Sequence, residues 1–224
     1  MGCPFARVAV WDTVTCQTSV IIAELQVYSI VDLSFSNNGK LLAIVSNDQY
    51  HTISVYDWQK NICLSKFSAA YNKILGLSFV QSDQSICVVG HELIQFWHNV
   101  ATKVPFFVHA DYCEMITKKQ TYLSVVEFQS LAVTSTAEGL LISFERNKLK
   151  RITQAHNGPV FAVHASRRGD LLATGNIASI VVFIFNSLLF LCYFRWLRWQ
   201  CSCMEFVLQL LARVQHFSSI KMPY

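Results

Sequence analysis

The chain has 224 residues, of which 53% are hydrophobic and only 14% are charged, and its formal net charge is +4. Residues 1–176 hold 14 Lys or Arg and 13 Asp or Glu, a net of +1, whereas residues 177–224 hold four cations and one Glu, a net of +3. A main body so close to neutral excludes the broad basic surface with which duplex-binding proteins neutralise phosphates.

A repeat of forty-odd residues runs through the first 176 residues. One of its elements is an apolar run that ends on an aromatic residue: VAVWD at 8–12, ISVYDW at 53–58, LIQFW at 93–97 and LLISFE at 140–145. The aromatic residues Trp11, Tyr56, Trp97 and Phe144 are separated by 45, 41 and 47 positions. Such a period, built from short strands, predicts the four-stranded blades of a β-propeller.

A second element marks the same period. The segment FSNNGKLLAIVSN at 35–47 resembles ASRRGDLLATGN at 165–176 after an offset of 130 residues, or about three periods. Asn37, Asn38 and Gly39 accept the positive φ that a hairpin turn needs. Short runs rich in Val, Ile, Leu and Phe predict strands at 30–35, 41–45, 53–56, 74–80, 86–89, 93–97, 122–128, 131–134, 140–144, 159–164 and 171–174. We therefore expect an antiparallel all-β array.

These units resemble WD40 repeats, with a His-containing turn (AHNGPV, 155–160), an Asp-bearing turn (SND, 46–48) and strands that end in WD or YD. The resemblance implies an all-β fold class, namely a partial WD40 β-propeller of about four blades, some incomplete. The composition and spacing of the residues after the repeats predict an apolar, helical C-terminal tail. In WD40 blades the turn Asp and the His join a hydrogen-bond network that staples the blade. The residues that match are Asp12, Asp48, Asp57 and His156.

The match extends to the echinoderm microtubule-associated-protein-like (EML) family. VAVWDTVTCQT, NDQYHTISVYDWQKNICLSKF, VVGHELIQFWHN and AHNGPVFAVHA follow the family pattern in order over about residues 5–176. The resemblance implies a cytoplasmic, cytoskeleton-associated interaction module whose partners are tubulin and microtubules. The family's coiled coil and HELP motif are absent and VAVWD begins in mid-blade, so we expect a fragment or a truncated product. The alternatives are a generic WD40 scaffold with no cytoskeletal role and a truncated product with no function.

The sequence shows no catalytic constellation: it has no Gly-rich phosphate loop, no GxSxG elbow and no paired carboxylates on one predictable element. The eight cysteines form no CxxC pair, and His91 and His98 match no zinc spacing. We therefore expect no enzyme activity, no cofactor and no metal.

Basic side chains are the candidate partner-binding residues, because the outer face of tubulin is acidic. They are Lys118, Lys119, Arg146, Lys148, Lys150, Arg151, Arg167 and Arg168. The alternative is that they belong to ordinary solvated turns.

The repeat is expected to stop at about residue 176. The offset of 130 places the next turn at 178–182, where the chain reads ASIVV, and β-branched residues resist the positive φ of a hairpin turn. We therefore divide the chain into WD40 repeats at 1–176 and a divergent apolar tail at 177–224.

The tail has two parts. Residues 177–194 carry no charge, and RWLRWQ follows them, as expected of a short membrane segment with an interfacial belt. Residues 203–217 have the helical spacing of an amphipathic helix. A membrane-attached product is one interpretation. The others are a divergent strand and helix packed on an open blade edge, and an alternative C-terminus with no evolved role.

Overall fold

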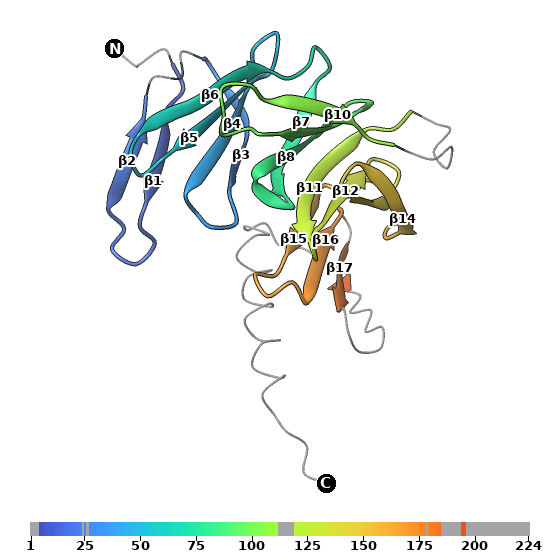
Figure 1. Ribbon diagram of the computed structural model, residues 1–224. Coiled ribbons are helices and arrows are strands. Elements are labelled where there is room, and N and C mark those ends of the chain that lie inside the picture. The colour runs from blue at the N-terminus through green and yellow to red at the C-terminus, as the bar shows by residue number, and fades with distance from the viewer. Residues whose placement is uncertain are drawn as a thin grey trace.

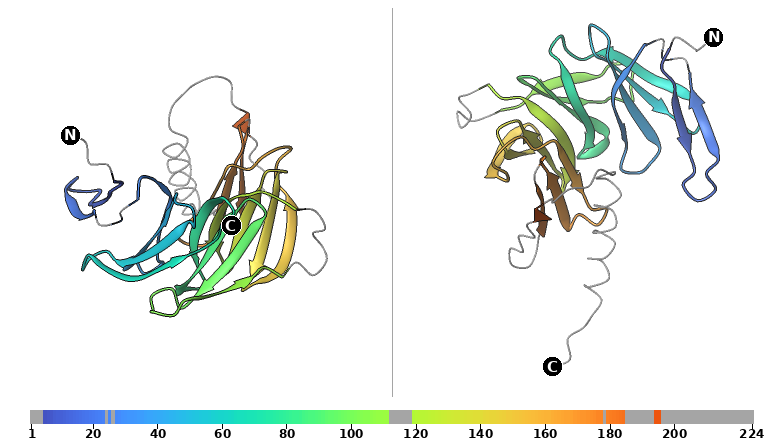
Figure 2. Two further views of the ribbon diagram at one scale, coloured as in Figure 1. Left: turned by 90° about the horizontal axis from the view of Figure 1, so that it is seen from above. Right: turned by 180° about the vertical axis from the view of Figure 1, so that it is seen from behind.

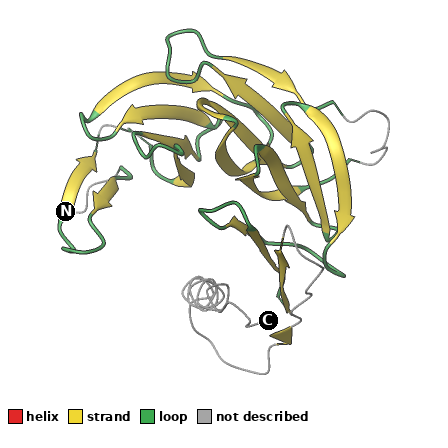
Figure 3. Ribbon diagram, turned by 60° about the horizontal axis from the view of Figure 1, so that its bottom comes forward, coloured by secondary structure: helices red, strands yellow, loops and turns green. Residues whose placement is uncertain are grey.

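The computed structural model describes residues 5–23, 25, 27–111, 119–177, 179–184 and 194–195. All regular structure in these residues is β-strand, arranged in four sheets of four strands and one sheet of two. Figure 1 shows each sheet as a separate blade, and Figures 2 and 3 show the blades side by side in an arc. The fold is a partial β-propeller, which confirms the predicted fold class. The helix expected at 203–217 lies outside the described residues.

Each blade is a meander in which every strand pairs antiparallel with the next one along the chain. The half-blade consists of β1 (Val8–Trp11) and β2 (Thr18–Ile22). The first blade consists of β3 (Ile30–Phe35), β4 (Leu41–Ser46), β5 (Thr52–Asp57) and β6 (Ile62–Ser68). The second blade consists of β7 (Ile74–Val80), β8 (Ser82–Gly90), β9 (Leu93–His98) and β10 (Phe106–His109). The third blade consists of β11 (Tyr122–Phe128), β12 (Leu131–Thr136), β13 (Leu140–Glu145) and β14 (Lys148–Gln154). The fourth blade consists of β15 (Ala162–Ala165), β16 (Leu171–Gly175), β17 (Ser179–Ile184) and β18 (Phe194–Arg195).

The hydrophobic core lies between the blades rather than inside any one sheet. One apolar layer packs the half-blade against the first blade, and further layers join the first to the second, the second to the third and the third to the fourth. The middle strands are therefore buried on both faces: Leu42, Ala43, Ile44 and Val45 of β4 are at most 1% exposed. Burial on both faces explains why the middle strands are nearly continuous apolar runs.

The first strands of the blades, β3, β7, β11 and β15, lie side by side at the centre of the arc. Polar side chains join them: Asp32 Oδ2 of β3 accepts a hydrogen bond from Leu77 N of β7 at 2.9 Å, and Ser34 Oγ accepts one from Phe79 N at 3.3 Å. Burial raises the pKa of the Asp32 carboxyl. Because both contacts advance along β3 and β7 in the same direction, these inner strands are parallel across blades.

The fourth blade extends past residue 176, which corrects the predicted end of the repeat. β17 pairs with β16 from Gly175↔Ile180 to Leu171↔Ile184, and β18 pairs with β17. In the first blade the corresponding last pair before the turn, between β4 and β5, is Val45↔Ile53. The turn between β16 and β17 is therefore three residues shorter than the turn between β4 and β5. Shortening the offset from 130 to 127 aligns IVVFI at 180–184 with ISVYD at 53–57. The β-branched residues Ile180, Val181 and Val182, which would form a poor turn, belong to the strand β17.

The same finding corrects the start of the predicted membrane segment at 177–194, because residues 179–184 form a strand of a blade. Among the described residues no helix is long and apolar enough to cross a membrane. Residues 185–193 lie outside the described part of the chain, as does most of the tail.

Candidate functional site

The three predicted aspartate staples hold their own turns. Asp12 Oδ1 accepts hydrogen bonds from Val14 N and Thr15 N at 2.8 and 2.7 Å. Asp48 Oδ1 accepts them from Tyr50 N and Thr52 N at 3.2 and 2.9 Å. Asp57 forms an ion pair with Lys60 at 2.9 Å, and the hydrogen bond from Lys60 lowers the pKa of the Asp57 carboxyl.

The predicted staple His156 joins two elements of the chain. It lies in the link between the third and fourth blades, is 3% exposed, and its Nε2 lies 2.9 Å from Thr174 Oγ1 of β16. Burial of the ring lowers the pKa of His156, because the charged imidazolium loses its hydration.

The buried histidine predicts that the protein loses stability in mild acid. Because the folded state binds the His156 proton less tightly than the unfolded state, this residue's contribution is complete above its ordinary pKa of about 6.5 and is lost as the pH falls below it. Urea unfolding at pH 8 and pH 5.5 should show a smaller acid loss for His156→Gln than for the parent chain. Equal losses in the two proteins would contradict the role of His156.

Because the strands of a meander alternate in direction, alternate turns of each blade lie at the same end of the molecule. We call this end the hairpin face. It holds the turns that join first to second strands and third to fourth strands, at 12–17, 36–40, 58–61, 81, 99–105, 129–130, 146–147 and 166–170. A cavity of about 520 Å³ confirms the convergence, since Phe35, Phe79, Phe128 and Ala165 from the inner strands of four blades line it together.

The carboxylate of Glu127 ties three blades together beside this cavity. Its Oε1 accepts a hydrogen bond from Gln81 N at 2.6 Å, and its Oε2 accepts one from Asn37 Nδ2. Gln129 Nε2 donates to Gly169 O of the fourth blade at 3.0 Å. The turns of the hairpin face are therefore joined to one another across the blades, and the charged side chains that they carry have fixed attachment points.

The hairpin face carries both cations and anions. Its turns and the residues within two positions of them hold seven cations and six anions, a net of +1: Lys40, Lys60, Lys103, Arg146, Lys148, Arg167 and Arg168 against Asp12, Asp57, Asp83, Glu127, Glu145 and Asp170. The opposite end carries three cations and three anions among the described residues: Arg7, Lys73 and Lys119 against Asp48, Glu92 and Glu138. Asp111 lies beside the last hairpin of the third blade, where its N donates to Asn147 O at 2.7 Å and its O accepts from Leu149 N at 2.9 Å.

Four predicted basic residues lie together on the last hairpin of the third blade. Arg146 occupies the turn with a φ of 58°, and Lys148, Lys150 and Arg151 follow on the outer strand β14. All four side chains are exposed. Lys150 forms an ion pair with Glu145 at 2.8 Å, and the hydrogen bond from Lys150 lowers the pKa of the Glu145 carboxyl.

The remaining predicted cations occupy other places. Arg167 and Arg168 are exposed on the first hairpin of the fourth blade, where Arg167 lines the cavity at the hairpin face. Lys119 lies at the opposite end and forms an ion pair with Glu92 at 2.7 Å. Lys118 lies outside the described residues. The structure therefore brings Arg146 and Lys148 to the same face as Arg167 and Arg168, and it separates Lys119 from them.

Sequence reasoning missed Lys40, Lys60 and Lys103, which are also exposed on the hairpin face. The signal was available, because turns separated by two strands of a meander must lie at the same end of a sheet. The structure contains no cluster of His, Cys, Asp or Glu with metal-binding geometry within its described residues.

Comparison with known proteins agrees with the fold and with part of the resemblance. No family model matches the sequence. The chain is 30% identical over 184 residues to echinoderm microtubule-associated protein-like 2 of Rattus norvegicus, covering 75% of this chain and 27% of that protein. It is 26% identical over 179 residues to the 77 kDa echinoderm microtubule-associated protein of Strongylocentrotus purpuratus, covering 75% of this chain and 26% of that protein. The chain thus spans about a quarter of the length of these relatives.

A solved structure supports the architecture. The β-propeller domain of Cps50 (Swd1) from Myceliophteria thermophila superposes with a TM-score of 0.67, covering 84% of this chain and 64% of that domain, at 14% sequence identity. At this identity the likeness concerns the fold alone. A WD40-type propeller with distant EML similarity is the framework of a protein-interaction module, and its partner has to be argued from its surface.

Proposed function

We propose that the chain is a non-enzymatic protein-interaction module that binds microtubules through its hairpin face. The observation that carries the proposal is the gathering of the exposed cations Arg146, Lys148, Arg167 and Arg168 at the hairpin face. Each of these cations is exposed and lies in or beside a tight hairpin, so little backbone has to be ordered when a partner binds.

Two further observations support this partner. The relatives that share 26–30% identity with the chain are named as microtubule-associated proteins. The outer surface of a microtubule is acidic, so it would attract the exposed cations of the hairpin face. We accordingly expect the protein in the cytoplasm, on microtubules, and we expect binding without catalysis.

Co-sedimentation with polymerised tubulin tests the proposal. The variant Arg146→Gln/Lys148→Gln/Arg167→Gln/Arg168→Gln should bind about tenfold more weakly than the parent chain, because each exposed charge contact contributes about 0.2–1 kcal/mol. Binding of the parent chain should also weaken as salt rises, since salt screens exposed charges.

The matched control is Lys73→Gln/Lys119→Gln, which removes two cations from the opposite end and should leave the pelleted fraction unchanged. Equal binding by the fourfold variant and the parent chain would contradict the role of the hairpin face. Absence of pelleting by the parent chain would remove the microtubule as the partner and leave a scaffold for other proteins.

A further inference from the structure

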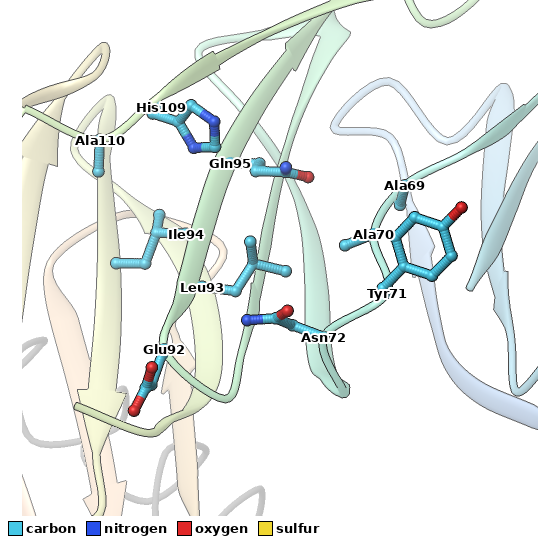
Figure 4. A pocket seen from close by; sticks show the side chains of 10 residues that line it. All are labelled: Ala69, Ala70, Tyr71, Asn72, Glu92, Leu93, Ile94, Gln95, His109 and Ala110. Carbon is cyan, nitrogen blue, oxygen red and sulfur yellow. The ribbon is translucent and has the colours of Figure 1, made fainter. Parts of the chain in front are cut away.

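A cleft opens between the first and second blades at the end opposite to the hairpin face. Its volume is about 470 Å³, within the range of 300–1,000 Å³ that is usual for small-ligand sites. Its walls are the link at residues 69–72, the start of β9 and the end of β10 (Figure 4). The end of β10 contacts the last hairpin of the third blade, since Asn147 Nδ2 donates to His109 O at 3.4 Å, but none of the cations used in the microtubule proposal lines the cleft.

One side of the cleft is apolar. Side chains alternate along β9, so Leu93, Gln95 and Trp97 share the face that is turned toward the first blade. Leu93 is 8% exposed and belongs to the apolar layer between the two blades, together with Ala69. Figure 4 shows Leu93 and Gln95 directed from β9 toward Ala69 and Ala70. The small alanine side chains leave space beside Leu93 that an aliphatic group could fill.

Two polar groups of the cleft, which Tyr71, Glu92 and His109 also line, are amides held in set orientations. Gln95 is 4% exposed, and its Oε1 accepts a hydrogen bond from Trp97 Nε1 at 3.2 Å. An indole N–H can only donate, so this contact directs the amide oxygen of Gln95 to Trp97 and leaves Nε2 as a donor in the cleft. Asn72 Nδ2 donates to His91 O at 3.1 Å, which leaves Asn72 Oδ1 as an acceptor. A donor and an acceptor thus accompany the apolar wall.

The charge of the cleft is balanced. Glu92 is the carboxylate that lines the cleft, and Lys119 pairs with it at 2.7 Å. An occupant that carries a net charge would gain no unpaired counter-charge from these residues and would lose its hydration on entering. The cleft therefore suits an uncharged group that has one aliphatic side and a peptide-like amide.

We propose that this cleft binds an extended, uncharged peptide segment of a partner protein. An aliphatic side chain of the segment packs against Leu93, Ala69 and Ala70. The adjoining main-chain carbonyl accepts a hydrogen bond from Gln95 Nε2, and a main-chain N–H donates to Asn72 Oδ1. The amide of Gln95 is a good anchor for this purpose, because its contact with Trp97 orients it before the peptide arrives.

A capped amino acid serves as the probe. N-acetyl-leucine methylamide carries one aliphatic side chain between two peptide groups, and a ligand of its size should bind with a Kd on the order of 1 mM. Titration into the full chain, followed by nuclear magnetic resonance, should give saturable shifts of the Gln95 side-chain amide and the Leu93 methyl groups. N-acetyl-glycine methylamide lacks the aliphatic side chain and should bind at least fivefold more weakly.

Two variants locate the site. Ala70→Leu fills the space beside Leu93, and Gln95→Met removes the amide, so each should weaken binding of the leucine probe at least tenfold. Gln59→Met is the control, because it makes the same change at an exposed position outside the cleft and should leave the affinity unchanged. Methyl spectra establish whether each variant is folded. If Gln95→Met does not fold, the binding of the leucine probe to Ala70→Leu and the affinity of the glycine probe still test the proposal. Unsaturable shifts, equal affinity of the two probes, or unchanged binding by Ala70→Leu would overturn the proposal.

Discussion

Replacing Gly139 by alanine is expected to lower the free energy of unfolding by about 3 kcal/mol or more, because backbone strain and a steric clash add at this position. Gly139 lies in the turn between β12 and β13 with a φ of +91°, which L-residues rarely adopt. A Cβ on this residue would lie 2.0 Å from His156 O and 2.9 Å from Gly158 O. Gly139 O also accepts hydrogen bonds from Ala155 N and His156 N, so the turn cannot move away from residues 155–158 without losing these bonds.

A second glycine separates strain from clash in this experiment. Gly39 has a φ of +72°, but a Cβ there would meet no atom within 4 Å. Gly39→Ala should therefore cost only the strain of the positive φ, about 1–2 kcal/mol. Urea unfolding of the two variants gives both values. Equal losses would contradict the close packing of the turn on the link between the third and fourth blades.

Truncation of Phe144 to alanine is expected to cost about 3–5 kcal/mol, the usual loss for a fully buried phenylalanine. Phe144 of β13 is 0% exposed, and its ring meets Phe96 of β9 edge-on with ring centres 5.8 Å apart. The two side chains belong to the layer that joins the second blade to the third. The substitution leaves a cavity between blades, so it should weaken their coupling as well as the third blade itself.

An exposed phenylalanine provides the comparison for Phe144. Phe161 is 52% exposed, and Phe161→Ala should change the free energy of unfolding by less than about 1 kcal/mol. Calorimetry and urea unfolding measure both variants. A loss below about 1 kcal/mol for Phe144→Ala would mean that the second and third blades do not pack as described.

The sequence predicted the buried strands well because each is sandwiched between two blades. β5, β9 and β13 show this, since their apolar runs and the aromatic positions Tyr56, Trp97 and Phe144 recur at the blade period. The outer strands β6, β10 and β14 escaped prediction. Each has solvent on one side, and residues such as Lys66, Lys148 and Lys150 break the apolar pattern that identifies a strand.

The third and fourth strands of the fourth blade escaped prediction for a different reason. A fixed offset of 130 residues assumes turns of equal length, and the turn between β16 and β17 is three residues shorter than the turn between β4 and β5. The strand β17 then carries no polar residue after Ser179. A strand buried in a sheet and a membrane segment both select such residues, so composition could not distinguish them.

The candidate sites were only partly predictable. The basic residues were found one by one, but their grouping on the hairpin face follows from strand direction rather than from spacing in the sequence. The cleft between the first and second blades was not predicted at all, because its parts come from residues 69–72, 92–95 and 109–110. Nothing in the sequence indicates that the amide of Gln95 meets the indole of Trp97.

Hydrogen exchange of the chain bound to polymerised tubulin tests the central claim most directly. The account predicts slower exchange at the turns of the hairpin face, above all at residues 145–149 and 166–170, with unchanged exchange at the opposite end around residues 69–73 and 91–92. Protection confined to that opposite end, or no protection at the hairpin turns at saturating tubulin, would contradict it.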